Sequence, residues 1–225
     1  MDLCFILVKP AVPGNIGAAA RAIKTMGFKR LRLVAPGDYL GPEARMLAHA
    51  SEEILEGAMV YSELKEAIAD LDMTVATTSK TRDARVKYIR ASEIPGVISS
   101  KGDTVHKIGL VFGREESGLS NDEIRMCDLV SSIPMKRPYP SLNLGQSVMV
   151  YAYIMASFEW TEPESSPGSL DKKGFRAMMD KSKEVLNKLD IEKTPALYNR
   201  ILERLASLGE DDIHLLHSIL NRYLK

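Results

Sequence analysis

Short apolar runs of strand length recur along this chain, and stretches that favour helix separate them. The runs are rich in Val, Ile, Leu or Phe, as expected for strands that are covered on both faces. Their alternation with helices predicts an α/β fold built on a mostly parallel sheet. The runs span residues 3–8, 31–34, 73–77, 108–112 and 129–133, with a weaker one at 59–61.

The size and charge of the chain limit what it can be. Its 225 residues allow one sizeable α/β domain with at most a small appendage. Lys plus Arg and Asp plus Glu both number 30, so a nucleic-acid partner would need a local basic patch. The apolar run at 3–8 stops at Lys9 and Pro10, which makes it too short for a signal peptide or a membrane span. We therefore expect a cytoplasmic protein without a membrane segment.

The cysteines and histidines give no sign of a metal site. Cys4 and Cys127 fall in no metal-binding or redox spacing, which predicts two reduced thiols. The four histidines form no ligand cluster, and the pair at 214 and 217 is typical of surface or bundle residues. We expect no metal ion.

A change in composition divides the chain into a main domain at 1–160, a linker at 161–169 and a helical extension at 170–225. In the main domain we predict helices at 18–26, with Asn15 as the N-cap, at 62–71 and at 144–160. The last helix would carry an apolar face formed by Val148, Tyr151, Ala152 and Met155. The candidate core residues of the extension are Leu186, Leu189, Leu197, Ile201, Leu202, Leu205, Leu208, Leu215, Leu216, Ile219 and Leu220.

Three glycine-rich or proline-rich segments could carry chemistry. The first, Gly-Asn-Ile-Gly-Ala-Ala-Ala-Arg-Ala at 14–22, follows a strand and opens a helix. Its free N–H groups could hold an anion, although a tight turn with close packing explains the same residues. The second, at 108–120, is a buried strand that ends in a charged glycine-rich loop. Ligands of parallel sheets gather at such strand ends, although a solvated ion pair would also fit.

The third segment comprises residues 133–135 and 139–146 and contains two prolines and several small polar residues. It predicts a rigid loop before the long helix, with Ser141 or Asn143 as the N-cap of that helix. A capping role does not exclude a role in a site.

These three segments together resemble the three motifs of the SpoU (TrmH-like) family, in the SPOUT class of RNA 2′-O-ribose methyltransferases. Their order, spacing and strand-then-loop context agree across residues 1–160. The phrases at 22–27 and 141–144 look most like the TrmJ-like branch, which methylates a nucleotide in the tRNA anticodon loop. The resemblance implies a C-terminal trefoil knot, which connection rules would normally exclude. It also implies S-adenosylmethionine (SAM) as methyl donor and a homodimer whose protomers pair at the knot.

The resemblance also implies which residues form the site. Arg21, Asn15, Glu115, Ser141 and Asn143 match the polar catalytic positions of the family. An arginine keeps its proton in proteins, so we expect Arg21 to stabilise the developing alkoxide, with Glu115 and Asn15 orienting it. Ser141 and Asn143 would place the ribose hydroxyl or hold the loop. The cofactor-binding positions are Thr77, Thr78, Ser79, Gly113, Ile133, Leu142 and Asn143.

A basic segment follows the expected cofactor strand and predicts RNA binding. It also contains Tyr88, which could stack on a base. A tRNA substrate is the first hypothesis and rRNA the second. From another class, the chain could be an RNA-binding or regulatory protein that does not catalyse methylation; SAM binding would separate these readings. The basic residues are Lys80, Arg82, Arg85, Lys87 and Arg90.

Overall fold

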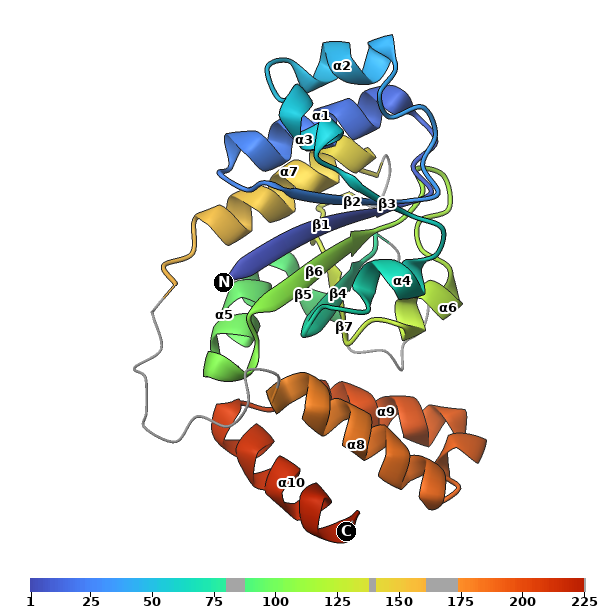
Figure 1. The fold of residues 1–225 in the computed structure, drawn as a ribbon, viewed down its shortest axis with the longest axis vertical. Helices are drawn as coiled ribbons and strands as arrows, with labels where there is room; N and C mark the ends of the chain where they lie inside the picture. Colours follow the sequence, from blue (N-terminus) through green and yellow to red (C-terminus); the bar gives the residue numbers. More distant parts are fainter. Residues whose placement is uncertain (80–87, 138–140, 161–173, 225) are drawn as a thin grey trace.

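Seven parallel strands form one sheet at the centre of the molecule (Figure 1). The computed structural model describes residues 1–79, 88–137, 141–160 and 174–224. The strand order is β3-β2-β1-β6-β4-β7-β5, and every neighbouring pair is parallel. The mostly parallel α/β fold is therefore confirmed. The strands are β1 (Asp2–Val8), β2 (Arg30–Val34), β3 (Met59–Tyr61), β4 (Met73–Thr77), β5 (Tyr88–Arg90), β6 (Lys107–Phe112) and β7 (Leu129–Ser132).

Six of these strands match the apolar runs to within one residue at each end. The sequence did not predict β5, because only Ile89 of its three residues is buried. The helices of the main domain are α1 (Pro13–Thr25), α2 (Pro42–Ala48), α3 (Glu52–Glu56), α4 (Leu64–Ile68), α5 (Ile94–Ser99), α6 (Asn121–Arg125) and α7 (Leu144–Ala156), with 3-10 turns η1 (Ala91–Glu93) and η2 (Gly102–Thr104). The extension contains α8 (Gly174–Lys188), η3 (Ile191–Lys193), α9 (Pro195–Ala206) and α10 (Glu210–Tyr223).

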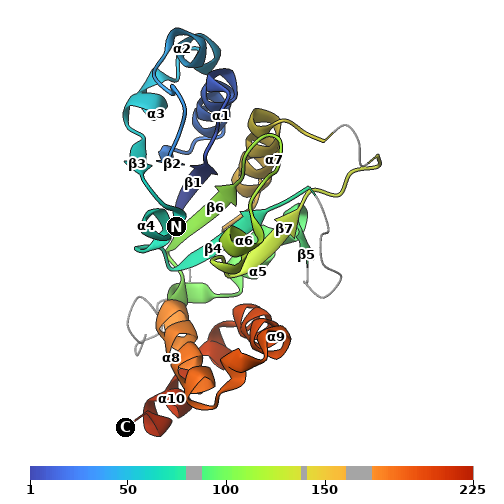
Figure 2. The ribbon, with the colours of Figure 1, turned by 90° about the vertical axis from the view of Figure 1, so that its right-hand side faces the viewer.

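Both faces of the sheet are covered, as the apolar strands predict. Alternate residues of β1 point to opposite faces: Phe5 belongs to the larger core cluster and Ile6 to the smaller one. Helices α1, α5 and α7 supply the larger cluster, whereas α4 and α6 pack against the smaller one (Figure 2). Because both faces of the sheet are buried, a ligand can reach it only at the ends of the strands.

The start of α1 differs from the prediction. The helix begins at Pro13 and its N-cap is Val12, so Asn15 lies inside the first turn and is not the N-cap. Proline is favoured at this position because its missing N–H needs no partner there. The Asn15 side chain instead donates to Glu115, at 3.2 Å from Nδ2 to Oε1.

Helix α7 has the predicted cap and the predicted buried face. Asn143 Oδ1 accepts a hydrogen bond from the Gln146 N–H at 2.7 Å, and Gln146 Oε1 accepts from the Asn143 N–H at 3.1 Å. The helix ends at Ala156 rather than at residue 160, and the Trp160 indole donates to the Met155 carbonyl at 3.1 Å. The predicted apolar face, Val148, Tyr151, Ala152 and Met155, is buried against the protein's own core.

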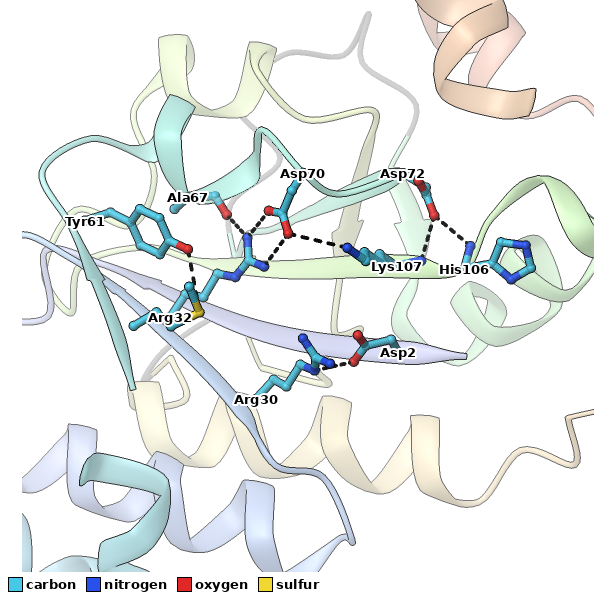
Figure 3. Close-up of polar contacts among 10 residues, drawn as sticks. Asp2, Arg30, Arg32, Tyr61, Ala67, Asp70, Asp72, His106 and Lys107 are labelled. Atoms are coloured by element: carbon cyan, nitrogen blue, oxygen red, sulfur yellow. Dashed lines mark hydrogen bonds and ion pairs between the residues drawn. The ribbon is translucent and has the colours of Figure 1, made fainter. Parts of the chain in front are cut away.

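Carboxylates and a buried guanidinium join the strands on the side away from the glycine-rich loops (Figure 3). Asp72 precedes β4 and accepts from the backbone N–H groups of His106 and Lys107, at 2.9 and 2.8 Å. Arg32 on β2 is 4% exposed and pairs with Asp70 at 2.5 and 2.9 Å. Such charge-assisted bonds stabilise a buried charge only when both partners are in place.

The extension docks at this same, amino end of β4, β6 and β7 (Figure 1). Lys101 is 0% exposed, and its Nζ donates to the carbonyls of Ala206, at 2.7 Å, and Leu208. Arg176 of α8 binds both carboxylate oxygens of Asp128, at 3.2 and 2.7 Å. These contacts make the extension an integral part of the described structure.

The core of the extension differs from the predicted leucine set. Leu186 and Leu220 are buried, but Leu189, Leu197, Leu215 and Ile219 are exposed. The reason is that α8 packs on the main domain as well as on its neighbours, so its residues near that contact are buried instead. These are Phe175, Met178 and Met179, together with Ala206 and Ile213 of the following helices.

Candidate active site at the carboxyl ends of the strands

A cavity of about 620 Å³ opens at the carboxyl ends of β4, β6 and β7. The start of α7 closes its far side. Parallel sheets bind ligands at this edge because the loops that follow the strands converge there. The predicted cofactor positions that line this cavity are Thr77, Thr78, Ser79, Gly113, Ile133 and Leu142.

The end of β4 supplies hydroxyl groups to the cavity. Thr77 is buried, and its Oγ1 donates to the Val111 carbonyl of β6 at 3.0 Å. The Thr78 N–H donates to the Ser131 carbonyl of β7 at 2.9 Å. These bonds hold the strand end rigid, whereas Ser79 remains exposed at the rim.

The loop after β6 is a tight turn that requires glycine at 113. A Cβ at that position would lie 2.1 Å from both the Gly118 carbonyl carbon and the Leu119 nitrogen. Residue 114 and Gly118 exchange backbone hydrogen bonds at 2.9 and 3.3 Å, which closes the loop. Arg114 also pairs with Glu123 at 2.9 and 2.8 Å, and this hydrogen-bonded pair lowers the pKa of Glu123 to about 2.

Glu115 joins the first motif to the second. Its carboxylate accepts from the N–H groups of Ala11 and Val12, at 3.1 and 3.2 Å, and from Asn15. Partial burial acts to raise the pKa of Glu115, but these hydrogen bonds outweigh it and the pKa is lowered. The side chain is therefore an anion at neutral pH and anchors the start of α1 beside the cavity.

Helix α7 brings residues to the cavity that were not among the predicted site residues. Leu144, Ser147 and Tyr151 line it together with Ser141 and Leu142. The three helix residues are spaced three and four apart, so helical periodicity could have found them. Tyr151 donates from its hydroxyl to Ser131 Oγ at 2.9 Å beneath the cavity. Asn143 is not among the lining residues; its side chain caps α7.

Arg21 lies outside the cavity of its own protomer. It is exposed on α1, and the cavity lining does not include it. The described contacts of Asn15 and Glu115 are with each other and with the turn at 11–12, so the expected orientation of Arg21 by these two residues is not present here. Within one protomer, Arg21 therefore does not line the cavity.

Of the predicted RNA-binding residues, only Arg90 falls in the described part of the chain. It is exposed at the end of β5. Lys80, Arg82, Arg85 and Lys87 lie outside the described residues.

The cavity suits SAM in size, lining and charge. Its volume lies within the ~300–1,000 Å³ typical of small-molecule sites. Ile133, Leu142 and Leu144 offer apolar surface for an adenine ring, and the strand ends offer hydroxyl and backbone groups. Glu115 and Glu116 are among the lining residues, while the charge of Arg114 is matched by Glu123. This balance favours a ligand with a sulfonium and an ammonium group.

The described residues provide neither a metal site nor a membrane-spanning helix. No group of three or more His, Cys, Asp or Glu side chains is placed to hold a metal ion among residues with an assigned position. No helix in the same ranges is long and apolar enough to cross a membrane.

Comparison with known proteins identifies the family of the chain. The sequence profile of the SpoU rRNA methylase family matches residues 2–153, and that of the C-terminal domain of the tRNA/rRNA methyltransferase LasT matches residues 172–225. The chain is 38% identical over 221 residues to a protein of Escherichia coli K12 described as an uncharacterized tRNA/rRNA methyltransferase LasT, covering 98% of this chain and 96% of that protein.

Two further relatives are TrmJ proteins. The chain is 41% identical over 152 residues to the tRNA (cytidine-2′-O-)-methyltransferase TrmJ of Methanocaldococcus jannaschii, covering 66% of this chain and 64% of that one. The crystal structure of TrmJ from Z. mobilis ZM4 matches over 100% of both chains with a TM-score of 0.71 and 28% identity. The expected family is confirmed: the chain belongs to the SpoU rRNA methylase family of SAM-dependent RNA methyltransferases.

Proposed function

We propose that this protein transfers a methyl group from SAM to the 2′-hydroxyl of a ribose in tRNA, and that it does so in the cytoplasm as a homodimer. The observation that carries the proposal is the cavity in which the second and third sequence motifs meet the end of β4 at the carboxyl ends of the strands. Its lining comes from the expected cofactor positions, and its charge suits a cationic ligand.

The chain's own residues have distinct tasks in this proposal. SAM, when bound, supplies an electrophilic methyl group on a positively charged sulfur. Thr77, Ile133 and Leu142 hold and orient it, and Ser141 at the cavity rim helps to position the ribose hydroxyl. Arg21 stabilises negative charge on the ribose oxygen and a neighbouring phosphate. Alignment of the reacting groups supplies much of the rate.

Asn143 and Glu115 act as positioning residues. Asn143 fixes the first turn of α7, on which Leu144 and Ser147 face the cavity. Glu115 fixes the start of α1, the helix that carries Arg21. In this proposal neither residue takes part in the chemistry itself. Each one holds a helix that carries residues of the site.

A homodimer explains why Arg21 lies outside the cavity of its own protomer. The partner's Arg21 would complete each site if α1 and α7 of two protomers pack together. Tyr153, which is 60% exposed, and the partly exposed Val150 lie on the outer face of α7 and form the proposed contact. The face formed by Val148, Tyr151, Ala152 and Met155 is buried in the protomer and cannot serve as the contact. The trefoil knot stays a prediction.

The RNA substrate is proposed from the relatives and from the basic segment. Relatives named TrmJ are tRNA 2′-O-methyltransferases, whereas LasT is described for both tRNA and rRNA. A non-catalytic RNA-binding protein would need neither the cavity nor the anchored α1. We therefore favour tRNA methylation over rRNA methylation and over binding alone.

The test combines SAM binding with methyl transfer. A ligand that binds only the native state stabilises it by ~2.7 kcal/mol at a hundredfold excess over its Kd, so SAM should raise the melting temperature. Radiolabelled methyl groups should then enter unmodified total tRNA. The phosphodiester bond next to each labelled ribose should resist alkaline hydrolysis, because a 2′-O-methyl group blocks cleavage. Absence of a melting shift at millimolar SAM would refute the methyltransferase function. Label in rRNA alone would identify rRNA, not tRNA, as the substrate.

A further inference from the structure

A second cavity, of about 270 Å³, lies between the main domain and the extension. We call it the interdomain cleft. Strands β5 and β7 with α6 form one wall, and helices α8 and α9 form the other. Its lining includes Tyr88, Ile89, Met126, Met179, Lys183, Asn199 and Leu202.

The walls of the interdomain cleft are fixed on both sides. Arg176 binds Asp128 beside it, and Lys101 holds the end of α9 through the Ala206 carbonyl. The Asp103 N–H also donates to Glu210, at the start of α10, at 3.1 Å. The interdomain cleft is therefore a preformed site, which avoids the cost of ordering loops on binding.

The lining of the interdomain cleft has the chemistry of a nucleobase site. Ile89 and Met179 are buried, and with Leu202 and the ring of Tyr88 they provide apolar surface for a flat ring. Asn199 is partly buried, and no other described residue forms a hydrogen bond with its side-chain amide. An amide of this kind can donate to and accept from the edge of a base. The volume is just below the ~300 Å³ at which drug-sized sites begin, so it suits a single base.

A cation at the same site suits the phosphate that accompanies a base. Lys183 on α8 is partly buried in the lining and has no carboxylate partner within the ranges that the structure describes. Arg125, also in the lining, is exposed and pairs with Asp122 at the surface. The unmatched charge on Lys183 is therefore available to an RNA backbone.

The position of the interdomain cleft links it to the candidate active site. Ser79 lines the active-site cavity and Tyr88 lines the interdomain cleft, so the residues directly before and after positions 80–87 belong to the two sites. The cleft includes Leu129 at the start of β7, and the cavity includes Ile133 just after its end. A strand of this length spans ~13 Å, which a few nucleotides can bridge.

We infer that the interdomain cleft binds an unpaired base of the RNA substrate, remote from the ribose that is methylated. The inference rests on the proposed function for its substrate. The extension thereby selects RNA by an exposed base at a set distance from the target.

Methyl NMR tests base binding directly, because Met126 and Met179 both line the interdomain cleft. The intact protein, labelled on its methionine methyl groups, is titrated with AMP, GMP, CMP and UMP to millimolar concentration. The resonances of Met126 and Met179 should shift with at least one of these, whereas that of Met46, exposed on α2, should not move. The Asn199→Ala variant should lose the shift.

Steady-state methylation of tRNA tests the function of the interdomain cleft. Asn199→Ala and Lys183→Gln should each raise the KM for tRNA about 5- to 10-fold, leaving kcat and SAM affinity unchanged. Leu202→Trp, which fills the cleft, should act in the same direction. The matched control is Leu197→Trp on the same helix, where the side chain is exposed outside the cleft. Because Leu202→Trp could disturb packing, the two polar variants decide the outcome.

Unmoved Met126 and Met179 resonances with all four nucleotides, or KM values within twofold of the wild type in both polar variants, would overturn the inference. If the wild-type protein methylates no tRNA, the proposed function fails. The NMR titration still decides base binding in that case, because it needs no turnover.

Discussion

The two ends of the parallel sheet carry polar groups of different kinds. At the carboxyl end, hydroxyls and short loops surround an open cavity, and Glu115 is held by hydrogen bonds from Ala11, Val12 and Asn15. At the amino end, Asp72, Asp128 and Lys101 are buried and used in contacts between elements. One end is built to receive a ligand, and the other fastens the extension. Substitutions at the carboxyl end should therefore reduce SAM binding and turnover, whereas substitutions at the amino end should reduce stability.

Gly113→Ala should have the largest effect, at the carboxyl end. The new Cβ would lie 2.1 Å from the Gly118 carbonyl carbon, so the loop must open. We expect SAM affinity to fall on the order of 1,000-fold, about 4 kcal/mol, with turnover lost. Calorimetry measures the affinity. Gly96→Ala is the control, because a Cβ there meets nothing within 4 Å. Near-normal SAM binding by Gly113→Ala would remove this loop from the cofactor site.

Asp128→Ala should be the most damaging change at the amino end. The side chain is 3% exposed and accepts from the Thr74 N–H at 2.8 Å as well as from Arg176. Its removal leaves a buried donor and a guanidinium without their partner, which should lower the free energy of unfolding by ~3–4 kcal/mol.

Urea denaturation measures this loss of stability. Asp122→Ala, whose carboxylate is 79% exposed, should cost less than ~1 kcal/mol. SAM affinity of the folded Asp128→Ala protein should stay within threefold of the wild type. A larger change would show that the two ends of the sheet are coupled.

Arg21→Ala should separate chemistry from cofactor binding. We expect kcat to fall about 100-fold, about 2.7 kcal/mol, with SAM affinity unchanged, because Arg21 lies outside the cavity lining. Lys24→Gln on the same helix is the control.

Mixed dimers of Arg21→Ala and Gly113→Ala subunits should recover activity that neither parent has. A fully active monomer, or mixed dimers without activity, would contradict the shared site.

The smallest predicted effect is a pH dependence at the amino end. Burial lowers the pKa of Lys101 to about 8 from 10.5, although Asp128 acts in the opposite direction. Between these values the unfolded chain binds more protons than the folded one, so stability rises with pH. The free energy of unfolding should increase by ~1.5 kcal/mol between pH 8 and 9.5. Lys101→Met should remove this slope in urea denaturation, and an equal slope in both proteins would refute the assignment.

The carboxyl end was largely predictable from the sequence, and the amino end was not. Apolar runs located six strands, and the resemblance to the SpoU family placed Thr77, Gly113 and Leu142 around one cavity. The role of Glu115 as the anchor of residues 11–12 depends on a contact across about 100 residues, which periodicity does not report. The buried Lys101 and the Arg176–Asp128 pair are equally non-local.

The exposed leucines of the extension show the same limit. A leucine pattern predicts helices, but the face that is buried depends on what the helix packs against. Phe175 and Met179 face the main domain, while Leu197 and Leu215 remain at the surface. Ser147 and Tyr151, by contrast, could have been assigned to the cavity from their spacing on α7.

The place of β1 in the sheet has a consequence for synthesis on the ribosome. This first strand is central and pairs with β6, so Phe5 contacts the strand of Leu110. At 5–20 residues per second, roughly 5–20 s pass between translation of the two strands. During that time the apolar edge of β1 has only β2 beside it. Nascent chains should therefore need a chaperone or rapid elongation to avoid association through this strand.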